Sequence, residues 1–313
     1  MMNSSLGDLD ATENYYGYNN TIDSFEYTEE MPPSVLGWIA LVGITLMACC
    51  IGFMGNGYII WLLGFQVKRN HFTTFILNLA IADFGFLMSV VIYNIYGFIE
   101  FEGSTVFYII CAFFFQMMHF NSHFLLTAIS IDRCVAVLFP VWHHCSQPKR
   151  LSSTVCVLLW IASFLLSGIM KIMTFTKVIV NDRLSVLHFL VTAIVCLPLI
   201  TLSTGVLFIK VCLKLNRKNQ GRLLLMILIT LLCFLILAFP LYLFVVIDNF
   251  FSIEIDPEIP YWETCIVLFS CLNSSINPVI YFLAGRKKGA RSKESMKVRL
   301  QKVFKEGEAT GGR

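Results

Sequence analysis

Asp83 is an acidic residue in the middle of an apolar stretch, where it needs a cation, a proton or several hydrogen-bond donors. Polar residues lie at a similar depth in other apolar stretches, and together they could form one cavity around Asp83, sized for a hydrated sodium ion. The alternative is a protonated Asp83 in a hydrogen-bonded network that only fixes helix packing, and the residues leave both interpretations open. The surrounding polar residues are Asn56, Ser122, Asn273, Ser274 and Asn277.

Asp132 and Arg133 form a second charged site, at the end of the third apolar stretch. Opposite charges in neighbouring positions at a membrane boundary can pair, and the arginine can instead reach a protein partner. The alternative is an interfacial pair that only follows the preference of basic residues for the inner membrane surface. The pair taken alone does not separate these two interpretations.

Cysteine and histidine do not indicate a metal site. The 11 Cys lie mostly inside apolar stretches, where they are interpreted as small buried hydrophobes, and no Cys/His group has zinc spacing. His119, Ser122 and His123 are close in sequence, but no acidic partner that would orient them is evident, so an enzyme is not expected. We expect no metal other than sodium, no further cofactor and no nucleic-acid partner.

Seven apolar stretches must position these residues. Hydrophobic residues make up 57% of the chain and charged residues 14%, against about 25% charged residues in a typical soluble domain. Crossing a bilayer takes about 20 residues, and only a helix pairs its backbone groups within one such segment. The sequence predicts an all-α membrane protein, a seven-transmembrane helix bundle with Pro198, Pro240 and Pro278 inside its last three helices. The stretches are 35–63, 73–98, 105–138, 151–173, 184–213, 223–249 and 261–284.

Basic residues predict how the bundle is oriented. Of the 23 Lys and Arg residues, only Lys171, Lys177 and Arg183 fall on the same side as the N-terminus. Because Lys and Arg accumulate on the cytoplasmic side, we expect a multi-pass plasma-membrane protein with an extracellular N-terminus. Asn3 and Asn19 begin glycosylation sequons on that outer side.

The chain divides into three parts by composition. Residues 1–33 are expected to form an acidic, glycosylated extracellular segment without a signal peptide, and residues 34–285 the helix bundle. Residues 286–313 form a basic cytoplasmic tail. Within it, apolar residues near helical spacing predict a short amphipathic helix over 291–305, which would bind membrane lipid of the cytoplasmic leaflet.

Residues at one position or more in each of the seven apolar stretches resemble the motifs of the rhodopsin-like G-protein-coupled receptors. They occur in the same order along the chain, and the resemblance covers about residues 35–305. One motif falls in each helix, and 277–281 matches the seventh-helix motif in full. Stretches at 60–65, 125–130, 137–142 and 273–278 resemble the Mas-related receptors within that family. Ala238 replaces the usual sixth-helix tryptophan, which that subfamily commonly lacks. The other matching positions are Gly55-Asn56, 79–83, Asp132-Arg133-Cys134, Trp160, Pro198 and Phe239-Pro240.

The resemblance implies a cell-surface receptor that activates a heterotrimeric G protein, with arrestin and a receptor kinase as further partners. Sodium at Asp83 would favour an inactive packing in which Arg133 pairs with Asp132. Activation would swing the sixth helix outward around Pro240 and free Arg133 for the G protein. The seventh-helix residues that would repack toward the third helix include Pro278 and Tyr281.

The ligand is expected to be a basic peptide or a small amphipathic cation. Phe115 occupies the position at which amine receptors have an aspartate, so the resemblance does not favour a biogenic amine. Acidic residues ring the outer mouth of the bundle and aromatic residues line it. The alternative for the acidic residues is outer solubility. The predicted pocket residues are Tyr93, Tyr96, Phe115, Met118, His119, Asp182, Tyr242, Asp248, Glu263 and Phe269.

Other classes of membrane protein fit the residues less well. An opsin-type light receptor would need a Schiff-base lysine in the seventh stretch, and 261–284 contains none. A transporter would show an internal repeat and several charges at mid-membrane depth, where only Asp83 qualifies. A transporter, or an orphan receptor with mainly constitutive signalling, stays as the alternative.

Overall fold

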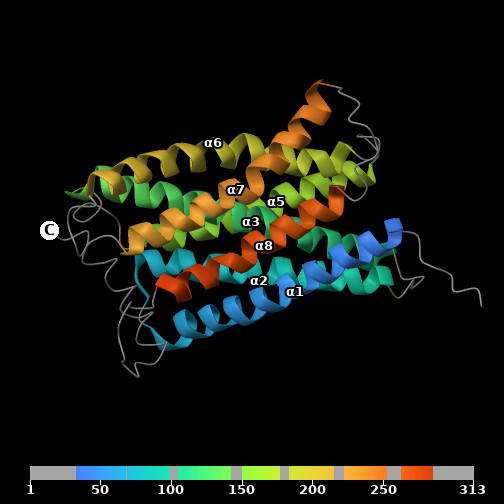
Figure 1. The fold of residues 1–313 in the computed structure, drawn as a ribbon, viewed down its shortest axis with the longest axis horizontal. Coiled ribbons are helices and arrows are strands. Elements are labelled where there is room, and N and C mark those ends of the chain that lie inside the picture. The colour runs from blue at the N-terminus through green and yellow to red at the C-terminus, as the bar shows by residue number, and fades with distance from the viewer. Residues whose placement is uncertain are drawn as a thin grey trace, which may run out of the picture.

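The computed structural model describes residues 33–67, 69–98, 105–141, 150–176, 183–214, 222–251 and 262–284. Within these ranges the protein consists of seven long α-helices and one π-helical turn, without a strand. The helices run side by side along one long axis (Figure 1). In chain order the elements are α1 (Pro33–Trp61), η1 (Leu62–Gln66), α2 (His71–Phe98), α3 (Thr105–Leu138), α5 (Leu151–Phe175), α6 (Arg183–Lys214), α7 (Arg222–Phe251) and α8 (Trp262–Ala284).

This architecture confirms the predicted bundle, and nearly all predicted helix ends agree within about two residues, the usual uncertainty of a helix boundary. The predicted end of the first helix at residue 63 lies two residues beyond the end of α1, within η1. The regular helix ends at Trp61 and continues as the wider η1 turn. Leu62 and Leu63 in that turn are fully buried, so the apolar stretch runs on while the helix changes its geometry.

The outer faces of the helices are suited to a bilayer. Five helices are long and apolar enough to cross a membrane over their described residues, while α6 and α7 contain the shorter apolar segments Ile194–Lys210 and Leu224–Ala238. Large hydrophobic side chains lie on the outside, for example Met47, Leu158 and Ile236 with 63%, 58% and 70% of their surface exposed. Such a surface is compatible with lipid and explains the high apolar content of the chain.

α1 packs closely against α8, beside which it lies in Figure 1. A Cβ atom at Gly52 would overlap with Ser275 of α8, and one at Gly55 would lie 2.6 Å from Cγ of Pro278. The Ser275 hydroxyl donates to the backbone oxygen of Ala48 at 2.8 Å. Small residues allow helix backbones to approach each other closely in a membrane. The two glycines therefore allow the short distance between α1 and the segment of α8 that contains Ser275 and Pro278.

α3 is the central helix, in contact with α2, α5, α6 and α7. α2 is tied to α5 by a hydrogen bond from Trp160 Nε1 to Asn78 Oδ1 at 3.0 Å. Asn78 in turn donates from Nδ2 to the backbone oxygen of Thr74 at 2.8 Å. The Trp160 bond thus fixes α2 to α5, while α2 also packs along α3.

Several predictions fall on residues outside the described ranges. Residues 1–32 include both predicted glycosylation sites, Asn3 and Asn19, and residues 285–313 include the predicted amphipathic helix. The three-part division of the chain therefore stays a prediction.

Candidate functional site

Asp83 on α2 is fully buried, and donors from α3 and α8 meet both oxygens of its carboxylate. The Ser122 hydroxyl donates to Oδ1 at 2.5 Å, and Asn277 donates from Nδ2 to Oδ2 at 2.8 Å. Ser274 of the same helix is also buried, with 3% of its surface exposed. Ser274 and Asn277 are three residues apart and therefore share one face of α8. Three helices thus meet at one carboxylate.

The two other residues predicted for this cavity have different surroundings. Asn56 donates from Nδ2 to the backbone oxygen of Ser274 at 3.1 Å and so links α1 to α8. Asn273 is 4% exposed, and among the described residues neither its Oδ1 nor that of Asn277 has a hydrogen-bond partner. Buried oxygens normally have partners, and carboxylate, hydroxyl and amide oxygens are what hard cations bind. The donor set therefore fits a sodium ion.

Asp132 and Arg133 pair at the far end of α3. Arg133 donates from Nε to Asp132 Oδ2 at 2.9 Å and from Nη2 to the same oxygen. The ring of Phe72 on α2 covers the guanidinium, with its centroid 4.5 Å from Cζ. Arg133 is only 7% exposed, so in this packing its charge is enclosed by α2 and α3.

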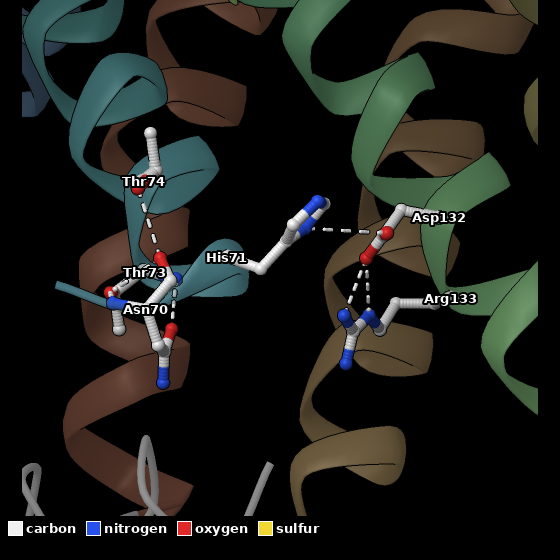
Figure 2. A network of polar contacts seen from close by, with 6 residues as sticks. All are labelled: Asn70, His71, Thr73, Thr74, Asp132 and Arg133. Carbon is white, nitrogen blue, oxygen red and sulfur yellow. Dashed lines mark hydrogen bonds and ion pairs between the residues drawn. The ribbon is translucent and has the colours of Figure 1, made fainter. Parts of the chain in front are cut away.

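The start of α2 places a histidine against this pair, as Figure 2 shows. Asn70 caps the helix: its Oδ1 accepts from the Thr73 backbone N–H at 2.7 Å, and its own N–H donates to Thr73 Oγ1 at 2.8 Å. This cap fixes the first turn, from which His71 reaches toward α3 with Nδ1 3.8 Å from Asp132 Oδ1. His71 was missed by sequence reasoning, although Asn70 and Thr73 have the spacing of a reciprocal cap.

The residues predicted to move on activation lie inside two helices. Pro278 is inside α8 against Gly55 of α1, and Tyr281 lies one turn further on with 4% of its surface exposed. Pro240 falls within α7, and its side chain is outside the described part. Figure 1 shows α7 crossing the bundle obliquely, with its C-terminal end apart from the other helices.

The predicted ligand residues on α3 form an aromatic stack. Phe115 lies nearly parallel to His119, with ring centroids 6.2 Å apart at 6°. Phe86 of α2 contacts both rings, at 5.2 and 5.1 Å between centroids. His119 Nε2 lies 3.4 Å from the Ser270 hydroxyl oxygen on α8. The stack therefore spans three helices at the side of the Asp83 cluster nearer the predicted outer mouth.

The remaining predicted ligand residues are only partly described. On α2, Tyr93 and Tyr96 lie against α3, with ring centroids 6.2 Å from Tyr108 and 5.7 Å from Phe107. The structure thus brings the aromatic residues of α2 and α3 together. Two further predicted ligand residues, Met118 on α3 and Phe269 on α8, are half-buried. The side chains of three others, Asp182, Asp248 and Glu263, lie outside the described part.

Tyr242 of α7 has a partner on α3 that is 119 residues away in sequence. Its hydroxyl lies 3.1 Å from Nε2 of His123. Nδ1 of His123 lies 2.8 Å from the backbone oxygen of His119, which can only accept. Nδ1 therefore has the proton, and Nε2 accepts from the tyrosine. Phe234 meets His123 edge-on at 5.3 Å, so His123 contacts α7 one turn on either side of Ala238.

Comparison with known proteins covers most of the chain. Residues 55–281 match the family described as 7 transmembrane receptor (rhodopsin family). Mas-related G-protein coupled receptor member H of Rattus norvegicus is 35% identical over 85% of this chain and 83% of its own length. Proto-oncogene Mas of Homo sapiens is 34% identical over 82% of this chain and 80% of its own. Mas-related G-protein coupled receptor member F of Homo sapiens is 32% identical over 90% and 81%.

Proposed function

This chain belongs to the rhodopsin family of seven-transmembrane receptors, among the Mas-related G-protein-coupled receptors, and we propose that it converts binding of an extracellular ligand into activation of a heterotrimeric G protein. The enclosed pair of Asp132 and Arg133 at the end of α3 supports this proposal most directly. Burying two charges costs solvation free energy, and their mutual attraction offsets it only in good geometry. Opening the pair would offer a positive charge to a partner protein.

The proposed switch has two packings of the bundle. In the described packing, Arg133 binds Asp132 and lies under Phe72. In the signalling packing, α7 swings outward around Pro240, Arg133 contacts the G protein, and α8 repacks toward α3 near Tyr281. A ligand drives this change only by binding the signalling packing more tightly than the resting one.

Sodium would stabilise the resting packing. Asp83, Ser122 and Asn277 belong to three different helices, so an ion bound among them would hold α2, α3 and α8 together. Asn273, whose buried side-chain oxygen has no hydrogen-bond partner among the described residues, is proposed as a further ligand. Repacking of α8 would then require the ion to leave, which makes sodium a negative modulator of signalling.

The proposed ligand is a basic peptide or a small amphipathic cation. The half-buried ring of Phe115 and the exposed ring of Tyr93 near the outer end of α2 supply an aromatic surface, with the buried His119 stacked behind Phe115. Aromatic faces attract cations, and the acidic residues predicted at the mouth, including Asp182 and Glu263, add charge attraction.

The chain is a multi-pass membrane protein, and its orientation is part of the proposal. The N-terminus lies outside the plasma membrane, with Asn3 and Asn19 glycosylated. Residues 286–313 then lie at the cytoplasmic leaflet, where arrestin and a receptor kinase would also bind.

Ligand and coupling are tested by G-protein dissociation in cells that display the full-length chain. Each G-protein family is assayed with a panel of basic and neutral peptides. We expect a basic peptide to trigger one family, with a potency loss of roughly ten-fold, or about 1.4 kcal/mol, in Asp182→Asn or Glu263→Gln. The control, Asp10→Asn in the N-terminal segment, should respond like wild type. A response to neutral peptides alone would contradict the proposed ligand class.

A further inference from the structure

A cavity lies on the flank of the bundle, between α2, α3, α5 and α6. Its volume is ≈ 430 Å³, and ligand pockets in proteins commonly occupy about 300–1,000 Å³. Nearly all of its lining is apolar. We call it the lateral groove, and its wall includes Phe75, Ala128, Val155, Leu159, Val195 and Leu199.

The lateral groove exists because two helices share a neighbour without packing on each other. α5 and α6 both pack against α3 but contact each other little, which leaves the seam between them open. Ala128 of α3 lies in this seam and, as a small residue, fills little of it.

The open side of the groove faces lipid. Ile131, Val195 and Leu199 line it and are 39%, 46% and 40% exposed, within apolar segments of α3 and α6. A molecule that reaches this side must be dissolved in the membrane. The apolar lining favours an alkyl chain over any polar ligand, since it offers few polar groups to replace lost water contacts.

Charge at one end of the groove indicates which lipid would bind. The wall there includes Asp132 and Leu151, the first residue of α5, and the exposed Arg150 directly precedes Leu151. The first turn of α5 has no acidic residue. In the proposed orientation this end meets the cytoplasmic leaflet, which contains anionic lipids. A phosphate group is complementary both to Arg150 and to the start of a helix.

We propose that the lateral groove binds one acyl chain of an anionic phospholipid of the cytoplasmic leaflet, with its headgroup at Arg150. The proposal rests on the orientation proposed above but not on G-protein coupling. An acyl chain against Ala128 and Asp132 packs beside the carboxylate that pairs with Arg133. Bound lipid therefore supports the resting packing of α3.

The test uses the purified full-length chain in phosphatidylcholine nanodiscs with trace phosphatidylserine that has a photoreactive group in its acyl chain. Crosslinked peptides are mapped by mass spectrometry. We expect labels concentrated on 124–135 and 195–199. Ala128→Trp and Leu199→Trp fill the groove from two helices and should each cut this labelling roughly ten-fold, whereas Ala162→Trp, on the exposed face of α5 outside the groove, should not.

Headgroup selectivity is tested in the same nanodiscs. A phosphatidylcholine probe should label the groove less than the phosphatidylserine probe, and Arg150→Gln should abolish that difference. Labels spread over all lipid-facing helices and unchanged by both tryptophan variants would overturn the site. Equal labelling by both probes would overturn the anionic ligand. No G protein or agonist enters the experiment, so its failure is distinguishable from failure of the receptor proposal.

Discussion

The hydroxyl of Tyr242 on α7 and Nε2 of His123 on α3 are 3.1 Å apart and form a hydrogen bond deep in the bundle. The bond joins the helix proposed to swing outward to the central helix. His123 and Tyr242 are both at most 4% exposed, so neither atom is expected to find water if the bond is lost. The contact lies near Ala238, where a larger residue of α7 would otherwise fill the space.

Tyr242→Phe should therefore destabilise the receptor. It removes the donor and leaves a buried nitrogen unpaired, which costs about 1–3 kcal/mol. The double variant His123→Leu/Tyr242→Phe replaces both partners by apolar groups and should lose less stability than the sum of the single variants. The apparent thermal midpoint of the purified receptor measures this, with Tyr58→Phe on α1 as the near-neutral control. Strictly additive losses would contradict a direct bond.

Sodium should stabilise the wild-type receptor through Asp83. At a sodium concentration 100 times its Kd, binding to the folded state adds about 2.7 kcal/mol. Asp83→Asn removes the charge and should abolish this response, while Ser122→Ala should weaken it. The measurement compares apparent thermal midpoints in sodium and in N-methylglucamine at equal ionic strength. An equal response in wild type and Asp83→Asn would remove Asp83 from any sodium site.

Gly55→Val should reduce the amount of folded receptor at the cell surface. Its Cβ would lie 2.6 Å from Cγ of Pro278, and overpacking typically costs about 1–3 kcal/mol. Gly43 lies on the same helix with nothing within 4 Å of the added Cβ, so Gly43→Val is the matched control. Surface staining and thermal midpoint should fall only for Gly55→Val. Equal losses for both would point to the helix itself and not to its contact with α8.

Asp132→Asn should raise signalling without agonist. The carboxylate that holds Arg133 becomes a neutral amide, so the resting packing loses a charge-assisted contact. Asp132→Glu keeps the charge and serves as the control. G-protein dissociation is recorded at matched surface expression. Unchanged basal signalling in Asp132→Asn would show that the pair does not restrain the receptor.

The fold was predictable because each transmembrane helix follows from local composition. In lipid, a single segment must satisfy its own backbone groups, so an apolar stretch such as 105–138 determines its helix without reference to the rest of the chain. The change from a regular helix to the wider η1 turn after Trp61 was not predictable in this way. Leu62 and Leu63 of η1 are as apolar as the residues before them, and composition does not distinguish a regular turn from a wider one.

The contacts of the candidate site were predictable only where two residues meet because they lie at the same depth in the membrane. Ser122 and Asn277 share the depth of Asp83, and the structure brings both to its carboxylate. Asn56 has a similar depth but bonds to the backbone of Ser274, because which way a side chain turns depends on the rotation of its helix about its own axis. His123 with Tyr242 depends on the same rotation, which periodicity alone does not provide.

The most direct test of the central claim is nucleotide exchange on purified heterotrimeric G protein by the reconstituted receptor with a basic peptide that triggers dissociation in cells, wild type against Arg133→Ala. Apparent thermal midpoints of both proteins first establish equal folding. The account predicts that wild type accelerates exchange and that Arg133→Ala does not, because the enclosed guanidinium is the group released to the G protein. Equal exchange by the two proteins would contradict the account.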